Sequence, residues 1–284
     1  MSDLAIRSPH PSRTRLLVFP REHGAWGILF VPLATGAAVG LWLGGTPTPI
    51  LLLVIAAFAL FCLRTPVESL LGSTPMRAQT PDEKRAVAAV IVLFAAIATA
   101  ALFALLWRGQ HRYLLTIGAA AAALFAAQIF VRKLGRGARM ASQLIGAAGL
   151  TLTAPAAYYV VTGVVDGRAI ALWLANTIFA GNQIHFVQMR IRSARLQSRQ
   201  EKLAQGRAFL VGQIAMIVLL AVAWSFTLLP GLVFAAFIPV LLRGVLWFVR
   251  KPEPLAVHRL GLTELAHAIV FGILLILAFG LAWT

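Results

Sequence analysis

Cysteine and acidic side chains are scarce in this sequence of 284 residues. It contains one cysteine, Cys62, and nine acidic residues against 25 lysines and arginines. A single cysteine excludes an intrachain disulfide. Charged residues make up only 12% of the chain, whereas a soluble domain carries about a quarter. Because 60% of the residues are hydrophobic, the composition excludes a soluble globular domain and indicates a polytopic membrane protein.

The net charge of +16 does not indicate nucleic-acid binding. Its lysines and arginines are spread over short segments between apolar runs, whereas a nucleic-acid-binding protein gathers them on one soluble face. We therefore expect membrane lipids, and no nucleic acid, as partners.

Nine apolar segments follow one another, separated by turns that contain glycine, proline or charged residues. Most are long enough to cross a hydrocarbon core of about 30 Å as a helix that rises about 1.5 Å per residue. The sequence predicts an all-α bundle of nine transmembrane helices over residues 21–284, preceded by a flexible basic tail over residues 1–20. The segments are 24–43, 47–71, 87–107, 113–131, 142–164, 169–189, 208–227, 229–250 and 265–283.

The basic residues alternate between the two sides of this predicted bundle. If the segments cross the membrane in turn, 22 of the 25 lysines and arginines fall on the side of the N-terminus. The positive-inside rule makes that side cytoplasmic. We therefore predict a cytoplasmic N-terminus and a C-terminus on the opposite side.

Other polar residues gather at the ends of the predicted helices on this cytoplasmic side. Charged groups in a membrane helix are costly unless they pair or meet a polar ligand. The pattern therefore predicts a polar cavity that opens to the cytoplasm. Its candidate residues are Arg21, Glu22 and His23 before the first segment; Arg64 and Glu68 at the end of the second, where Pro66 is expected to break the helix; Arg132 and Lys133 at the end of the fourth; Asn176, Asn182, Gln183, His185, Gln188, Arg190 and Arg192 in and after the sixth; and Glu264 and His267 at the start of the ninth.

Simpler interpretations exist for each group. Arginines at helix ends often extend their charged groups to the membrane surface. Glu264 follows Thr263 and could stabilise the N-terminal end of its helix. The amides of the sixth segment could form interhelical hydrogen bonds. Asn176, Gln183 and Arg190 are spaced by seven, so they share one helix face.

The block Pro20-Arg21-Glu22-His23-Gly24-Ala25-Trp26-Gly27, followed by Pro32, resembles the signature of the YwiC-like family of bacterial membrane proteins. It also resembles the first helix of the UbiA superfamily of intramembrane prenyltransferases. That resemblance implies a UbiA-like bundle in the bacterial inner membrane, with longer cytoplasmic loops after the second and sixth helices. In UbiA-type enzymes, aspartate-rich motifs at these two places bind Mg²⁺ and the diphosphate of an isoprenoid donor.

The chain departs from the UbiA motifs at both places. The first motif position has Arg64 and Glu68 with no aspartate, and the second has Asn182, Gln183 and His185. Glu68 and Asn182 are the oxygen donors left for Mg²⁺. The resemblance implies a transferase for an isoprenoid diphosphate and a lipophilic or aromatic acceptor. Arginines 21, 64, 190 and 192 would then neutralise the diphosphate, with His23, Glu68 and His185 as catalytic candidates.

Two other functions fit the same residues. The acidic and imidazole side chains, with the Glu264-x-x-His267 spacing, are typical of a transition-metal or redox site that binds Zn, Fe or Cu. A non-catalytic lipid-binding protein or transporter on the same scaffold is the other alternative. A transporter would place ionisable groups near the bilayer midplane, whereas most of these lie at one end.

Overall fold

The computed structural model describes residues 17–18, 23–72, 77–109, 112–194, 196, 198–251 and 255–283. These residues are helical or lie in short turns, and they contain no strand, which confirms the all-α prediction.

Nine helical rods run through the described part of the chain, and each overlaps one predicted segment. The fifth rod is two helices in line, preceded by a single 3₁₀ turn at Arg136–Ala138. The rods are α2 (His23–Trp42), α3 (Ile50–Leu70), α4 (Pro81–Gly109), α5 (Tyr113–Lys133), α6 (Arg139–Thr151) with α7 (Thr153–Thr162), α8 (Gly167–Arg192), α9 (Arg199–Ser225), α10 (Val233–Val249) and α11 (Val257–Trp283).

Six of these rods are long and apolar enough to cross a membrane within the described residues: α3, α4, α5, the α6–α7 pair, α9 and α11. Two shorter apolar stretches, Trp26–Trp42 in α2 and Val233–Val249 in α10, lie beside them. The remaining rod, α8, has 26 residues and contains the amides identified in the sequence. These helices make the chain a multi-pass membrane protein.

Three helices begin earlier than their apolar segments predict. Hydropathy marks the part of a helix that suits hydrocarbon, but a helix continues into water wherever its first N–H groups find acceptors. Thr80 and Glu83 form a reciprocal capping box before α4, in which each side chain accepts from the other's backbone N–H. Ser198 similarly accepts from the Glu201 N–H at the start of α9. The polar residues 81–86, 199–207 and 257–264 are therefore helical.

The fifth predicted segment is interrupted, contrary to the single helix that its hydropathy predicts. Leu152 forms a turn between α6 and α7. Pro155 has no N–H and so cannot donate to the Thr151 carbonyl. The Thr153 hydroxyl donates to the carbonyl of Leu150 and also lies 3.1 Å from that of Leu29 on α2, which ties the interruption to a neighbouring helix.

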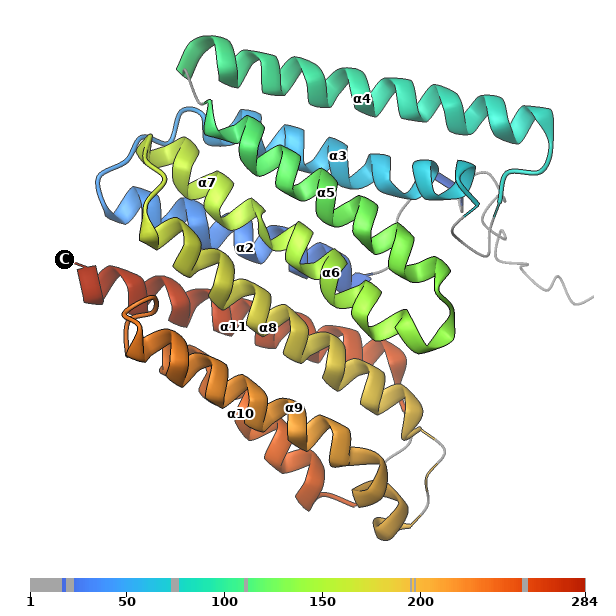
Figure 1. Ribbon diagram of the computed structural model, residues 1–284, viewed down its shortest axis with the longest axis vertical. Helices are drawn as coiled ribbons and strands as arrows, with labels where there is room; N and C mark the ends of the chain where they lie inside the picture. Colours follow the sequence, from blue (N-terminus) through green and yellow to red (C-terminus); the bar gives the residue numbers. More distant parts are fainter. Residues whose placement is uncertain are drawn as a thin grey trace, which may run out of the picture.

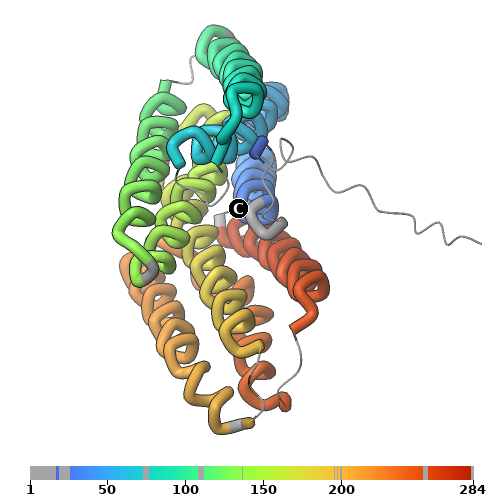
Figure 2. Tube along the Cα trace, turned by 90° about the vertical axis from the view of Figure 1, so that its right-hand side faces the viewer, coloured from blue at the N-terminus to red at the C-terminus, as the bar shows by residue number. Residues whose placement is uncertain are grey.

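The central helix of the bundle is α2, which contacts α3, α6, α7, α8 and α11. The outermost helices are α4 on one side and α9 and α10 on the other (Figure 1, Figure 2). Glycine residues of α2 allow α7 to approach this helix closely. A Cβ atom on Gly36 of α2 would overlap the backbone carbonyl of Ala154 on α7, and one on Gly40 would lie 3.0 Å from Val161.

The connections α3–α4, α5–α6, α8–α9 and α10–α11 gather at one end of the bundle, toward the right and bottom of Figure 1. The other connections and the C-terminus lie at the opposite end. We call the first end the basic end, because its connections contain the lysine- and arginine-rich segments of the sequence.

Candidate functional site

Glu68 holds two arginines at the basic end. Its Oε1 accepts from Arg64 Nε at 3.0 Å, and its Oε2 accepts from Arg132 Nη1 at 3.1 Å. The side chains of Glu68, Arg64 and Arg132 are 8%, 19% and 36% exposed. We call these three residues the Glu68 cluster. Because two guanidinium groups surround one carboxylate, the Glu68 cluster has a net positive charge. It lies at a position that is partly open to solvent.

Local sequence positions two of its members, and helix packing supplies the third. Arg64 and Glu68 are four apart on α3, so they share a face. Pro66 does not break this helix, which continues to Leu70; the prediction of a break there is wrong, because the loss of one hydrogen bond is tolerated inside a packed helix. Arg132 comes from the last turn of α5. The guanidinium of Arg77 lies close to Gly72, just beyond the end of α3.

A second polar group, the Arg243 cluster, joins α8, α10 and α11. Arg243 of α10 donates through Nη1 to Glu264 of α11 and through Nη2 to the Asn182 Oδ1 of α8 at 2.8 Å. The Gln183 amide donates to the Glu264 backbone carbonyl at 2.7 Å. Both charged side chains are 8% exposed, and the guanidinium lies 4.0 Å from the centre of the Phe186 ring. This cluster is a buried, charge-neutral ion pair with amide support.

The amides of α8 reach four different helices. Asn176 donates to the Thr35 hydroxyl of α2 at 3.1 Å, and Gln188 donates to Gln143 of α6 at 3.2 Å. Asn182 and Gln183 serve α10 and α11 in the Arg243 cluster. Interhelical hydrogen bonds therefore account for each of these amides, so the predicted convergence of all of them on one cavity is not what the structure has.

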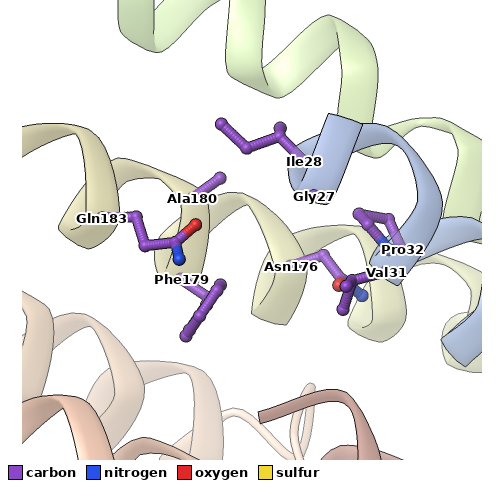
Figure 3. Close-up of a pocket in the computed structure, with 8 residues that line it drawn as sticks. All are labelled: Gly27, Ile28, Val31, Pro32, Asn176, Phe179, Ala180 and Gln183. Atoms are coloured by element: carbon purple, nitrogen blue, oxygen red, sulfur yellow. The ribbon is translucent and has the colours of Figure 1, made fainter. Parts of the chain in front are cut away.

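Two of the amides do share a hollow. Asn176 and Gln183 lie on one face of α8 with Phe179 and Ala180, opposite Gly27 to Pro32 of α2 (Figure 3). This agrees with their spacing of seven. The hollow has room for about one water molecule. The hollow is too small for a diphosphate in this conformation.

The described imidazoles do not meet the acidic residues. His185 packs edge-on against Phe209 of α9, with 5.4 Å between ring centres. His267 bonds through Nδ1 to the Thr263 carbonyl of its own helix at 2.7 Å, while Glu264 turns to Arg243. Among the residues that the structure describes, no three His, Cys, Asp or Glu side chains gather into a metal-binding group.

The remaining candidates are placed as follows. Arg21, Glu22 and the side chain of His23 lie outside the described residues. Arg190 is half-buried near the end of α8 and Arg192 is exposed. Leu17 and Val18 fall within the predicted N-terminal tail. They are buried in a cluster with Val87 of α4.

Glu68 and Asn182 do not form a Mg²⁺ site in this arrangement. Mg²⁺ requires several oxygen ligands in near-octahedral geometry. Both carboxylate oxygens of Glu68 and the carbonyl oxygen of Asn182 accept from guanidinium groups, and the two residues belong to different clusters. Arginine donors occupy the positions that a metal ion would need.

Two residues organise the clusters from other helices, Arg132 and Arg243. The sequence placed Arg132 at the polar end of the bundle without naming its partner, and Arg243 was considered only as a basic residue at a helix end. A usable signal existed for Arg243, because it lies inside an apolar segment, and a charge within a membrane helix marks a functional or paired group.

Part of the chain matches a known family. The family described as YwiC-like protein matches residues 19–158, a stretch that includes α2 to α6, the first part of α7 and the whole Glu68 cluster. No curated protein and no solved structure matches the chain. The Arg243 cluster lies beyond the matched stretch. Residues 19–158 of this chain are therefore similar to the YwiC-like family, in agreement with the resemblance of the block at Pro20–Gly27.

Proposed function

We propose that this protein binds the diphosphate group of an isoprenoid lipid at the Glu68 cluster and acts as a UbiA-like membrane transferase. One observation carries the proposal: a single buried carboxylate fixes two partly exposed guanidinium groups at the basic end. Guanidinium groups bind phosphate oxygens by paired, charge-assisted hydrogen bonds. Among the described residues, neither terminal amino group of Arg64 forms a hydrogen bond, so both are available to a ligand.

The arrangement suits the departure of a diphosphate. When the bond between the allylic carbon and the diphosphate oxygen breaks, the leaving group takes the electron pair and gains charge. Preorganised cations stabilise that charge in the transition state. Arg64 and Arg132 are held in place by Glu68, so they need little reorganisation. The acceptor forms the new bond to the allylic carbon and releases a proton to water, because His185 packs against Phe209 of α9 and not beside the Glu68 cluster.

Ligand-induced thermal stabilisation tests this function. We expect geranylgeranyl diphosphate to raise the melting temperature of the purified protein in detergent, because a ligand that binds only the folded state stabilises it. Replacing both Arg64 and Arg132 by alanine should weaken binding at least about tenfold, since a hydrogen bond to a charged group contributes about 1.5–3 kcal/mol. Arg85→Ala is the matched control, because Arg85 is 84% exposed on α4.

Geranylgeraniol, which lacks the diphosphate, provides the second control. Equal stabilisation by the alcohol and the diphosphate would contradict recognition of the head group and favour a non-catalytic lipid-binding protein. If the diphosphate stabilises the protein but product never forms with any aromatic acceptor, diphosphate binding stands and the transferase reaction fails.

We also propose that the basic end faces the cytoplasm of a bacterial inner membrane. Nine crossings would then place the C-terminus on the other side, in accordance with the distribution of lysine and arginine. Alkaline phosphatase fused after Thr284 should be active, and green fluorescent protein fused there should be dark. The opposite pair of results would reverse the orientation.

A further inference from the structure

Four buried side chains of α9, α10 and α11 contain polar atoms without a partner. They are Nε of Arg243, Oε1 of Glu264, the indole N–H of Trp247 and both amide atoms of Gln213; none has a hydrogen-bond partner among the residues that the structure describes. The four residues are 6–8% exposed. Leaving such atoms dry is costly, because each has given up its hydrogen bonds to water without a replacement, so a small hydrogen-bonding ligand at this place has a strong energetic basis.

These residues lie along one seam of the bundle. Gln213 of α9 faces α10, because its amide lies 3.5 Å from the position of a Cβ on Gly244. Toward the basic end, Gly206 of α9 meets Trp247. Further along, Lys202 donates to the Arg250 carbonyl and lies 4.7 Å from the centre of the Trp247 ring. Lys202, Trp247 and Gln213 thus lie at intervals along the α9–α10 seam between the basic end and the Arg243 cluster, with the rings of Phe209 and Phe248 packed beside them.

The chemistry of the unpartnered atoms selects the ligand. Two are donors only, one is an acceptor, and the Gln213 amide offers both functions. Arg243 and Glu264 compensate each other's charge, so the site attracts neither an anion nor a cation strongly. A neutral molecule that donates and accepts hydrogen bonds fits this set. The tight burial restricts it to the size of water, which typically takes two to four polar partners in a protein interior.

We propose that the α9–α10 seam is a hydrated polar path that carries water from the basic end to the Arg243–Glu264 pair. It is a second site, separate from the Glu68 cluster, and it does not depend on the function proposed above. Water on this path solvates the free oxygen of Glu264 and allows proton exchange with it from the basic end. The path belongs to the part of the chain beyond the YwiC-like match.

Cysteine accessibility on α9 tests the path. In a Cys62→Ala background, reconstituted in liposomes, Gln213→Cys should react with 2-aminoethyl methanethiosulfonate. Met216→Cys and Ile214→Cys should react at least about tenfold more slowly, because the thiolate is the reactive form and a thiol in apolar surroundings stays protonated. Met216 lies one turn away in the apolar core and is 4% exposed, and Ile214 is 55% exposed on the outer surface. Equal rates at positions 213 and 216 would overturn the proposal.

A measurement on the unmodified chain is independent of these variants. Hydroxyl radicals produced from water by X-rays should oxidise Trp247, although it is only 6% exposed, and should leave the 4% exposed Met216 intact. A methionine is readily oxidised, so its protection would report a dry environment. Oxidation of Met216 without oxidation of Trp247 would place water elsewhere and refute the path.

Discussion

Arg243→Met alone is expected to lower the free energy of unfolding by about 3–5 kcal/mol, because it leaves the carboxylate of Glu264 buried without its cation. Arg243 and Glu264 are both 8% exposed, so water cannot replace the lost partner fully. The Asn182 carbonyl oxygen would also lose its donor. The measurement is the midpoint of unfolding of the purified protein in mixed micelles.

The double variant Arg243→Met/Glu264→Met should recover most of that loss. Replacing a buried ion pair by apolar side chains of similar size is often neutral or stabilising, because the desolvation cost of both charges disappears. The non-additivity of the two substitutions measures their coupling. If the double variant is no more stable than Arg243→Met, the pair does not act as a unit and the interpretation of this cluster is wrong. Arg85→Met, at an exposed position of α4, should have almost no effect.

Gly36→Ala should cost at least about 3 kcal/mol, the upper end of the range for overpacked cores. The added methyl group would overlap the backbone carbonyl of Ala154, and a backbone cannot change rotamer to avoid it. The two helices α2 and α7 would have to separate. This would disturb the central helix of the bundle and the contacts of α2 with α8 and α11.

The same substitution at Gly118 is the matched control. Nothing lies within 4 Å of a Cβ at that position of α5, so Gly118→Ala should stabilise the helix by up to about 1 kcal/mol through its higher helix propensity. Apparent melting temperatures in one detergent would compare the two variants. Equal effects at Gly36 and Gly118 would show that the close contact between α2 and α7 is not a constraint.

Hydropathy and charge were sufficient to predict the helical rods, because the length of an apolar run and its flanking residues are local properties. They were insufficient at the helix starts, where Thr80–Glu83 and Ser198–Glu201 extend α4 and α9 through polar sequence. They also missed the break at Leu152. Capping and interruption depend on single hydrogen bonds, to which an average over an apolar segment is insensitive.

For the candidate sites, the sequence identified many of the participants but not their partners. Glu68 and Arg64 are four apart on one helix, so their pairing is visible in the sequence, whereas Arg132 joins them from α5. Glu264 was matched with His267, three residues away, yet it pairs with Arg243 on another helix. A spacing along one helix reveals only neighbours on that helix.

By itself, the sequence determined that this chain is an all-helical membrane protein with its cations concentrated at one end. Both properties follow from the transfer of side chains between water and hydrocarbon, which depends on each segment alone. The tertiary structure alone decided that the α8 amides bond to four different helices and that Arg243 is buried against Glu264. The rotation and neighbours of each helix determine such partnerships, and these arise only when the helices pack together.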